Sequence, residues 1–206
     1  MISPVYIFLF FAMALTASTE VGPGQWVELV LGSSGAEPIL IMALTAGLVA
    51  ICRFFAGPVV EKLGQTGVLL GGAIFAAVGI YLFSVVTGPM AYVAAIIYAL
   101  GYCYFWPVMV GAVAQRVPAS SALGMSVIGA VGMFSTGIFQ PIIGSWIDGS
   151  RAENIAEGLS GSALELATGQ DTLQKMLAFP VILIVLFAIF FFWQKNSKKA
   201  VPESEK

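Results

Sequence analysis

Residues 67–86 read GVLLGGAIFAAVGIYLFSVV and contain no charged side chain. A bilayer core about 30 Å thick is crossed by roughly 20 apolar residues in helical conformation. The stretch is long enough to span a membrane, and it is apolar on every side of a helix rather than along one stripe. It predicts a membrane-spanning helix and makes an all-α integral membrane protein the expected fold class.

The same pattern recurs on both sides of this stretch, in runs with few or no charges that end at turn residues. The composition agrees, because 59% of the residues are hydrophobic, 10% are charged and the mean hydropathy is +0.95. Such values lie far from those of a soluble domain. We predict one membrane domain over residues 1–206, with six transmembrane helices at about 4–31, 38–55, 67–86, 90–113, 122–147 and 173–193.

The first of these spans allows more than one interpretation. Residues 14–18 resemble the processing site of a secretory signal peptide, but the basic segment that such a peptide needs is missing. Gly22-Pro23-Gly24 predicts a break in the helix, and broken helices at membrane depth are typical of transporter substrate sites. Glu20 would then be an intramembrane carboxylate. In the alternative, the helix ends near Val21, residues 22–35 form an outer loop, and Glu20 lies at the interface.

Lysine and arginine positions predict the orientation, because cytoplasmic loops retain these residues. Arg53 and Lys62 flank the connection between the second and third spans, and several lysines follow the sixth. We therefore expect a multi-pass protein of the cell inner (plasma) membrane with both termini cytoplasmic. Residues 195–206 would form a cytoplasmic tail. Residues 149–172 would form an outer loop that is most flexible at 158–162, with a short surface-lying helix at about 155–166.

The composition also excludes several classes of function. The chain has no histidine, and its two cysteines lie in apolar stretches, so a Ser-His-Asp triad, a Cys/His zinc site and a disulfide scaffold are not expected. The predicted spans contain no cluster of carboxylates that could bind a metal. A net charge of −2 gives no broad basic surface for nucleic acid. We therefore expect neither an enzyme nor a cofactor, and the lipid bilayer is the first predicted partner.

Polar side chains are distributed unevenly among the predicted spans. The third and sixth spans contain almost none that are strongly polar, whereas the first, second and fifth contain residues such as Thr16, Thr45 and Ser135. Polar groups avoid lipid, so the third and sixth spans are expected to face it. A peripheral third member in each half is what two three-helix inverted repeats would produce.

The connection between the second and third spans, residues 53–64, reads RFFAGPVVEKLG. Gly57 would let two helices approach, Gly64 permits a left-handed turn, and Glu61 can pair with a cation or cap a helix. The segment resembles the Gly-x-x-x-Asp-Arg/Lys-x-Gly loop between the eighth and ninth helices of major facilitator superfamily transporters. The resemblance implies a cytoplasmic gate made of Arg53, Gly57, Glu61, Lys62 and Gly64. The alternative is a short membrane turn with incidental charges.

Three further segments carry the same resemblance. Residues 101–118, GYCYFWPVMVGAVAQRVP, are similar to the tenth helix of bacterial members of the superfamily. Residues 129–148 are similar to the eleventh helix, and residues 19–26, TEVGPGQW, to the seventh. The chain thus resembles the C-terminal six-helix half of a transporter of the bacterial sugar/nucleoside-permease-like branch. This implies a partner, either an N-terminal six-helix half or a second copy, and a chain that is a fragment, a split-gene product or a dimerising half.

The implied function is secondary active transport of a small polar, sugar- or nucleoside-like solute by alternating access. If transport is proton symport, Glu20 is the candidate proton carrier, since no other carboxylate falls clearly within a span. Aromatic side chains at membrane depth suit stacking on a substrate ring, with helix packing around Pro107 as the competing role. A non-transporting scaffold or assembly subunit is the alternative function. The expected substrate-binding residues are Glu20, Gln25, Trp26, Tyr102, Tyr104, Trp106 and Gln140.

Overall fold

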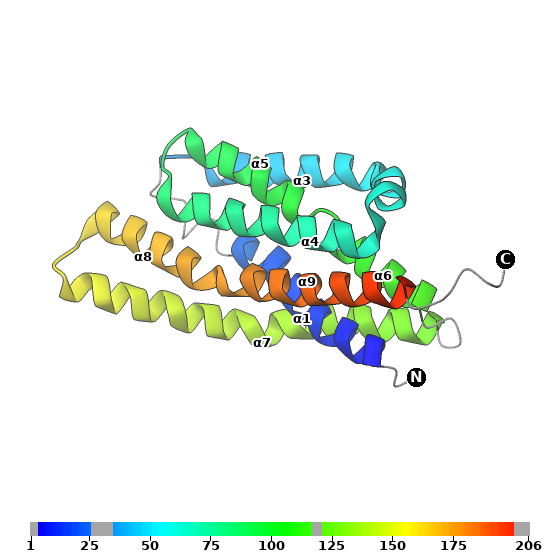
Figure 1. Ribbon diagram of the computed structural model, residues 1–206. Helices are drawn as coiled ribbons and strands as arrows, with labels where there is room; N and C mark the ends of the chain where they lie inside the picture. Colours follow the sequence, from blue (N-terminus) through cyan, green and yellow to red (C-terminus); the bar gives the residue numbers. More distant parts are fainter. Residues whose placement is uncertain (1–3, 26–34, 117–120, 200–206) are drawn as a thin grey trace, which may run out of the picture.

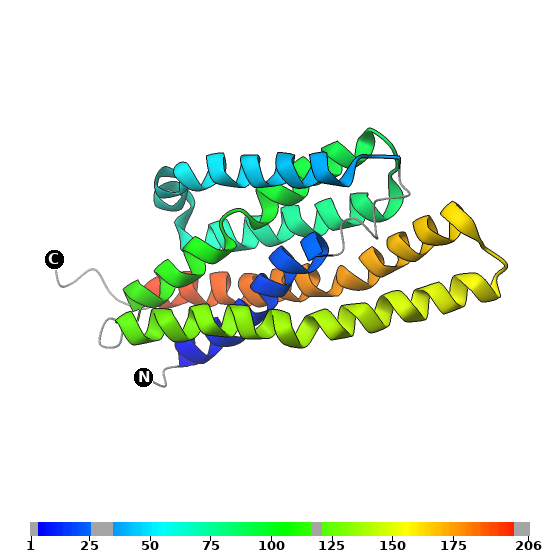
Figure 2. The same cartoon turned by 180° about the vertical axis from the view of Figure 1, so that it is seen from behind.

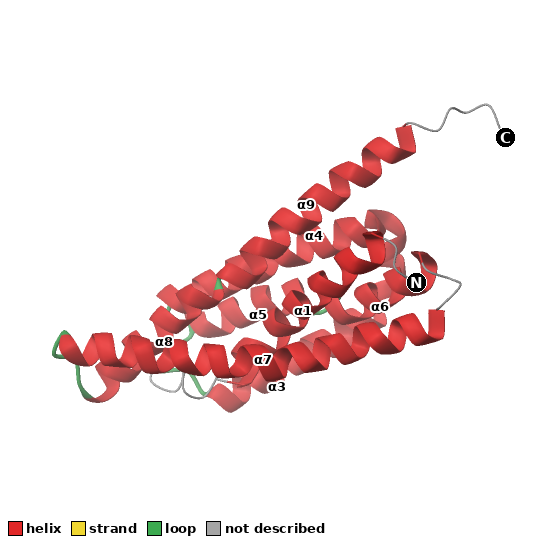
Figure 3. Ribbon diagram, turned by 90° about the horizontal axis from the view of Figure 1, so that it is seen from below, coloured by secondary structure: helices red, strands yellow, loops and turns green. Residues whose placement is uncertain are grey.

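The computed structural model describes residues 4–25, 35–116 and 121–199. These residues form helices joined by short connections, and no strand occurs among them (Figures 1 and 3). The helices are α1 (Pro4–Gln25), α3 (Pro38–Phe54), α4 (Ala56–Val85), α5 (Met90–Tyr102), α6 (Phe105–Arg116), α7 (Ser121–Ala156), α8 (Gly161–Met176) and α9 (Ala178–Lys199).

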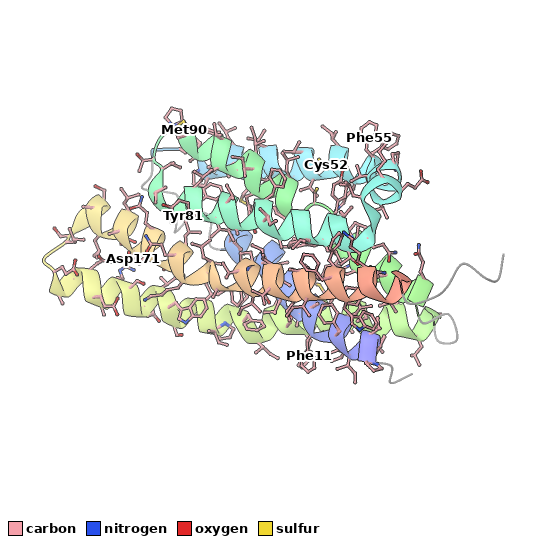
Figure 4. The ribbon with its side chains drawn as sticks, viewed as in Figure 1. Phe11, Cys52, Phe55, Tyr81, Met90 and Asp171 are labelled. Atoms are coloured by element: carbon pink, nitrogen blue, oxygen red, sulfur yellow. The ribbon has the colours of Figure 1, made fainter. Side chains whose placement is uncertain are left out.

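Helix length and apolar character confirm a multi-pass membrane protein. Among the described residues, 5 helical stretches are long and apolar enough to cross a bilayer, namely Pro4–Gly24, Ala56–Val85, Met90–Gln115, Ala122–Ala156 and Gly161–Lys195. Helix α3 is apolar but has only 17 residues, so a sixth crossing stays a prediction. Large apolar side chains such as Phe11, Tyr81 and Met90 project outward from the bundle, as they do in contact with lipid (Figure 4).

The helices form two groups that pack on each other. Helices α3, α4 and α5 lie together, while α1, α7 and the α8–α9 pair lie across from them (Figures 1 and 2). Helix α4 packs most extensively on α5 and also contacts α9, and α1 packs chiefly on α7. The beginning of α1 and the end of α9 lie at the same end of the bundle (Figure 1). That arrangement agrees with the prediction of two termini on one side of the membrane.

Two of the predicted spans are each built from two helices. The fourth span is interrupted at Cys103 and Tyr104, between α5 and α6, and the sixth at Leu177, between α8 and α9. Each interruption lies three or four residues before a proline, Pro107 or Pro180. A proline donates no backbone hydrogen bond to the carbonyl four residues earlier, and its ring crowds that turn. The interruptions therefore follow from the two prolines.

Residues 149–172 are largely helical, so the loop conformation predicted for them is wrong, whereas their place on the outer side of the membrane stays a prediction. Helix α7 continues to Ala156, and its 36 residues span about 54 Å at 1.5 Å per residue, well beyond a bilayer core of about 30 Å. After a turn in which Gly158 and Gly161 have φ of 89° and 62°, α8 returns antiparallel to α7. This α7–α8 hairpin projects past the other helices (Figures 1 and 2). A surface-lying helix at 155–166 is also wrong, because those residues contain the turn.

Polar side chains between the two helices explain why this hydrophilic segment is helical. Asn154 on α7 is buried and donates to Asp171 on α8 at 2.7 Å, and Asp171 lies in the hairpin in Figure 4. Lys175 donates to the buried Ser150 hydroxyl at 2.9 Å, and Arg151 pairs with Glu165. Each helix thereby provides partners for several polar groups of the other.

The connection between the second and third spans is shorter than predicted. Only Phe55 separates α3 from α4, and the chain bends at Gly64, whose φ of 71° and ψ of 156° are not helical. The expected need for glycine at this turn is confirmed. The expected close helix approach at Gly57 is wrong within this chain, because a Cβ there would meet nothing within 4 Å.

Glycines instead bring α4 and α5 together. A Cβ at Gly79 would lie 2.5 Å from the backbone of Tyr98, and one at Gly101 would overlap the backbone of Ala76. This close packing buries one face of α4, whereas α7 has the smallest buried share of the membrane-spanning helices. The opposite face of α4 carries the exposed side chains of Ile74, Phe75, Val78 and Tyr81, and contact of the third span with lipid stays a prediction for that face. The pair of inverted three-helix repeats remains a prediction.

Candidate functional site

A charged pair lies between α1 and α3. The Glu20 carboxylate on α1 pairs through Oε1 with Nη2 of Arg53 on α3 at 2.7 Å, and only 16% of the Glu20 side chain is exposed. Helix α1 continues past Val21 to Gln25. The alternative in which the helix ends near Val21, leaving Glu20 beside an outer loop, is therefore wrong.

The expected break at Gly22-Pro23-Gly24 does not occur, and the reason lies on α5. Pro23 is inside α1, so the carbonyl of Thr19, four residues earlier, has no helical donor. The Tyr98 hydroxyl donates to this Thr19 carbonyl and lies 3.2 Å from the carbonyl oxygen of Glu20. Tyr98 is itself buried. The hydroxyl replaces the missing hydrogen bond and fixes α1 against α5 beside Glu20.

The same relation recurs at Pro107. Its missing N–H frees the carbonyl of Cys103, which accepts a hydrogen bond from Nε of Arg53 at 2.9 Å. Arg53 thus binds Glu20 through one nitrogen and the α5–α6 junction through another, which the rigid fork of a guanidinium allows. Two proline-freed carbonyls therefore anchor the charged pair from two sides. The family resemblance implied a gate role for Arg53, which stays a prediction, and the structure pairs Arg53 with Glu20.

A small pocket adjoins the charged pair. Its free volume is about 50 Å³, enough for roughly one or two water molecules and far below the several hundred Å³ of a typical ligand site. Oε2 of Glu20 is buried and has no hydrogen-bond partner in the described part of the chain. The pocket is lined by Glu20, Pro23, Gly24, Ile41, Met42, Thr45, Phe83, Tyr98, Tyr102 and Leu173.

The structure brings only some of the predicted substrate-binding residues together. Glu20 and Tyr102 line the pocket, whereas Tyr104, Trp106 and Gln140 do not. The Trp106 ring packs where α6 meets α7, because a Cβ added at Gly132 would lie 2.8 Å from it. This position favours the helix-packing role of Trp106 over the substrate-stacking role. The side chain of Gln25 and the whole of Trp26 lie outside the described residues.

The remaining gate residues lie apart from this pocket. Glu61 and Gly64 line a second cavity of about 530 Å³, together with Gln65, Gln115 and Lys195. This cavity lies where α4, α6 and α9 meet. Lys62 is exposed nearby. A gate role for Gly57, Glu61, Lys62 and Gly64 stays a prediction.

Sequence reasoning missed Tyr98 and the pairing of Arg53 with Glu20. The spacing of the prolines could have indicated where partners were needed, because each proline leaves the carbonyl four residues earlier unbonded. It could not have named the donors, since Tyr98 is 79 residues from Thr19. Thr45, which lines the pocket beside Tyr102, was only noted as polar.

Among the residues that the structure describes, no group of three or more His, Cys, Asp or Glu side chains could hold a metal ion. Comparison of the chain with protein-family models, with curated proteins and with solved structures gives no match. The superfamily resemblance is therefore carried by the sequence motifs alone.

Proposed function

We propose that this chain is one half of a secondary transporter that carries a small polar solute by alternating access. The observation that supports this most directly is the Glu20–Arg53 pair between α1 and α3, in which only 16% of the Glu20 side chain is exposed. Charged groups inside a membrane are costly, and they are retained mainly where they bind or move a solute or a proton. Glu20 also keeps one buried oxygen, Oε2, without a partner in the described residues.

The pocket beside Glu20 supports a half rather than a complete transporter. At about 50 Å³ it is too small for a sugar or nucleoside, which need a site of roughly 300 Å³ or more. A second bundle that closed over this face would supply the missing walls. The solute would then lie between two six-helix units that rock about it.

Surfaces that a second bundle could cover are present on α3 and α7. Ala43, Gly47 and Ala50 are exposed along α3, and a Cβ at Gly47 would meet nothing within 4 Å. Small residues of this kind allow close packing between membrane helices. Helix α7 is the least buried of the membrane-spanning helices. The partner in this proposal is an N-terminal six-helix unit or a second copy of the chain.

The proposal is tested by ligand-induced stabilisation of the full chain in lipid nanodiscs. Thermal unfolding would be followed with a panel of neutral sugars and nucleosides, for wild type, Glu20→Gln and Glu61→Gln. A ligand at 100 times its Kd stabilises by about 2.7 kcal/mol. We expect a stabilising ligand for wild type and for Glu61→Gln, whose substitution lies outside the pocket, and no such effect in Glu20→Gln.

Solute uptake by proteoliposomes that contain only this chain then distinguishes a second copy of the chain from a different six-helix unit as the partner. Uptake would indicate that a second copy completes the transporter, whereas binding without uptake would indicate a different six-helix unit. If no sugar or nucleoside stabilises wild type, a second copy does not complete the site, and transport would require a different six-helix unit. If Glu20→Gln is stabilised as much as wild type, Glu20 does not lie in the solute site and the transport proposal fails. The exposed small residues of α3 would then favour the alternative, a membrane scaffold or assembly subunit.

A further inference from the structure

The two cysteines of this chain come together although they lie on different helices. Cys52 is near the end of α3 and Cys103 is at the α5–α6 junction. Both are free and buried, and they form a small cluster with Val49 and Ala99 that is separate from the main core. Cys52 is labelled on α3 in Figure 4.

Backbone and side-chain contacts fix how the two cysteines face each other. Arg53, the neighbour of Cys52, donates through Nε to the carbonyl of Cys103 at 2.9 Å, so the end of α3 is held at this level of the junction. The Cys103 thiol lies 3.3 Å from the carbonyl oxygen of Leu100. The Cys52 and Cys103 side chains are in hydrogen-bonding contact with each other. Two neighbouring thiols on separate helices can be joined by a disulfide without a large backbone movement.

We propose that Cys52 and Cys103 form a reversible disulfide when a membrane-permeant organic hydroperoxide reaches them. Cys52 is 9% exposed whereas Cys103 is fully buried, so Cys52 reacts first. Its sulfur attacks the hydroperoxide, the O–O bond breaks, and the products are a sulfenic acid on Cys52 and an alcohol that takes the thiol proton. The Cys103 sulfur then attacks the Cys52 sulfur and expels water. Two thiols lose two hydrogens and two electrons, and the hydroperoxide is reduced to alcohol and water.

Proximity makes the second step favourable, because a thiol already in contact with the sulfenic acid reacts as an intramolecular partner. The disulfide would join α3 covalently to the α5–α6 junction, next to the hydrogen bond of Arg53. A dithiol reductant reverses the bond by exchange. This disulfide would form whether or not the protein transports a solute.

The test uses the full-length protein in nanodiscs treated with tert-butyl hydroperoxide, then denatured in excess maleimide and analysed by intact mass. We expect wild type to lose two hydrogens and to take up no maleimide. Peptide mapping should join the peptides that contain Cys52 and Cys103. Treatment with dithiothreitol before labelling should restore two maleimide additions.

The control moves one thiol by a helical turn. In Leu100→Cys/Cys103→Ser the second thiol replaces a side chain that is 38% exposed and does not belong to the cluster that holds Cys52. We expect wild type to form the intramolecular disulfide at least about tenfold faster than this variant. Cys52→Ser and Cys103→Ser should each keep one thiol and form no intramolecular bond. Equal rates in wild type and the control, no disulfide in wild type, or only disulfide-linked pairs of chains would overturn the proposal.

Discussion

At the scale of single residues, two prolines shape the candidate site because each lacks a backbone N–H. Pro23 and Pro107 each leave a carbonyl unbonded in a membrane helix, where no water is at hand to satisfy it. Tyr98 and Arg53 provide the replacement donors. The two prolines, which in the sequence indicate helix breaks, thus give two attachment points, carbonyls that hold Tyr98 and Arg53 in place around Glu20.

Replacing Tyr98 with phenylalanine tests the first attachment point. The variant keeps the ring but removes the donor to the Thr19 carbonyl, and a buried polar group left unpaired costs about 1–3 kcal/mol. We expect a lower free energy of unfolding, measured in mixed micelles. Tyr81→Phe is the matched control, because the Tyr81 ring is 55% exposed, and it should unfold like wild type. Equal stabilities of the two variants would contradict this role of Tyr98.

A double-mutant cycle tests whether Glu20 and Arg53 act as a unit. Arg53→Gln leaves the mostly buried Glu20 carboxylate without its partner, and Glu20→Gln leaves the partly exposed Arg53 guanidinium without its own. The two single variants together should therefore lose more stability than the double variant loses. We expect a coupling of about 0.5–2 kcal/mol, since one group of the pair is partly exposed and membrane interactions are modest. Unfolding of the four proteins is measured at one pH. A coupling of zero would mean that the pair contributes nothing to the fold.

The sequence predicted part of this site. Glu20 and Tyr102 were expected at membrane depth and do line the pocket, because a carboxylate or a tyrosine in an apolar run is conspicuous. Arg53 was assigned elsewhere, because it lies close in sequence to Glu61 but 33 residues from its partner Glu20. Hydropathy gives the depth of a side chain in a span, but it does not give the neighbouring helix that the side chain faces.

At the scale of helices, apolar runs predicted where the membrane segments lie but not where the helices end. Residues after Ile147 include Asp148, Arg151 and Glu153, a composition typical of a loop, yet α7 continues through them. Their helical state depends on pairing with α8, a contact that a local pattern does not reveal. Helix ends outside the membrane are therefore decided by tertiary packing.

Replacing Asn154 with alanine tests the pairing within the hairpin. The change removes the donor to Asp171 and leaves a polar group in the α7–α8 interface, at a cost of roughly 1–3 kcal/mol. We expect faster amide hydrogen exchange in residues 148–174 and unchanged exchange in α4 and α5, measured by mass spectrometry. Ala152→Ser, on the exposed side of α7, should leave amide exchange unchanged in the hairpin and in α4 and α5. Uniformly faster exchange throughout the chain would instead mean that the hairpin is not an independent unit.

Glycine packing between α4 and α5 gives a test at the same scale. Gly79→Ala adds a Cβ that would lie 2.5 Å from the Tyr98 backbone, so the two helices must separate, and overpacking of this kind costs about 1–3 kcal/mol. Gly71→Ala is the control, since its Cβ would meet nothing within 4 Å. We expect a lower thermal midpoint for Gly79→Ala alone. Equal midpoints would show that the interface can shift at little cost.

At the scale of the whole molecule, the orientation in the membrane is open to direct measurement. Lysines and arginines predict cytoplasmic termini, so the hairpin tip should face outward. Ser160→Cys, placed in a Cys52→Ser/Cys103→Ser background, should react with an impermeant maleimide added to intact cells, because Ser160 is exposed at the tip. Labelling only after permeabilisation would reverse the predicted orientation.

The length of α7 has a mechanical consequence. Of its 36 residues, enough extend past the bilayer to form a lever of roughly 24 Å. A tilt of about 10° within the membrane would therefore displace the tip by roughly 4 Å, a change that paired spin labels can resolve. Because α7 lies directly against α1, which carries Glu20, labels at the tip would report tilting of the bundle while every side chain of the pocket stays intact.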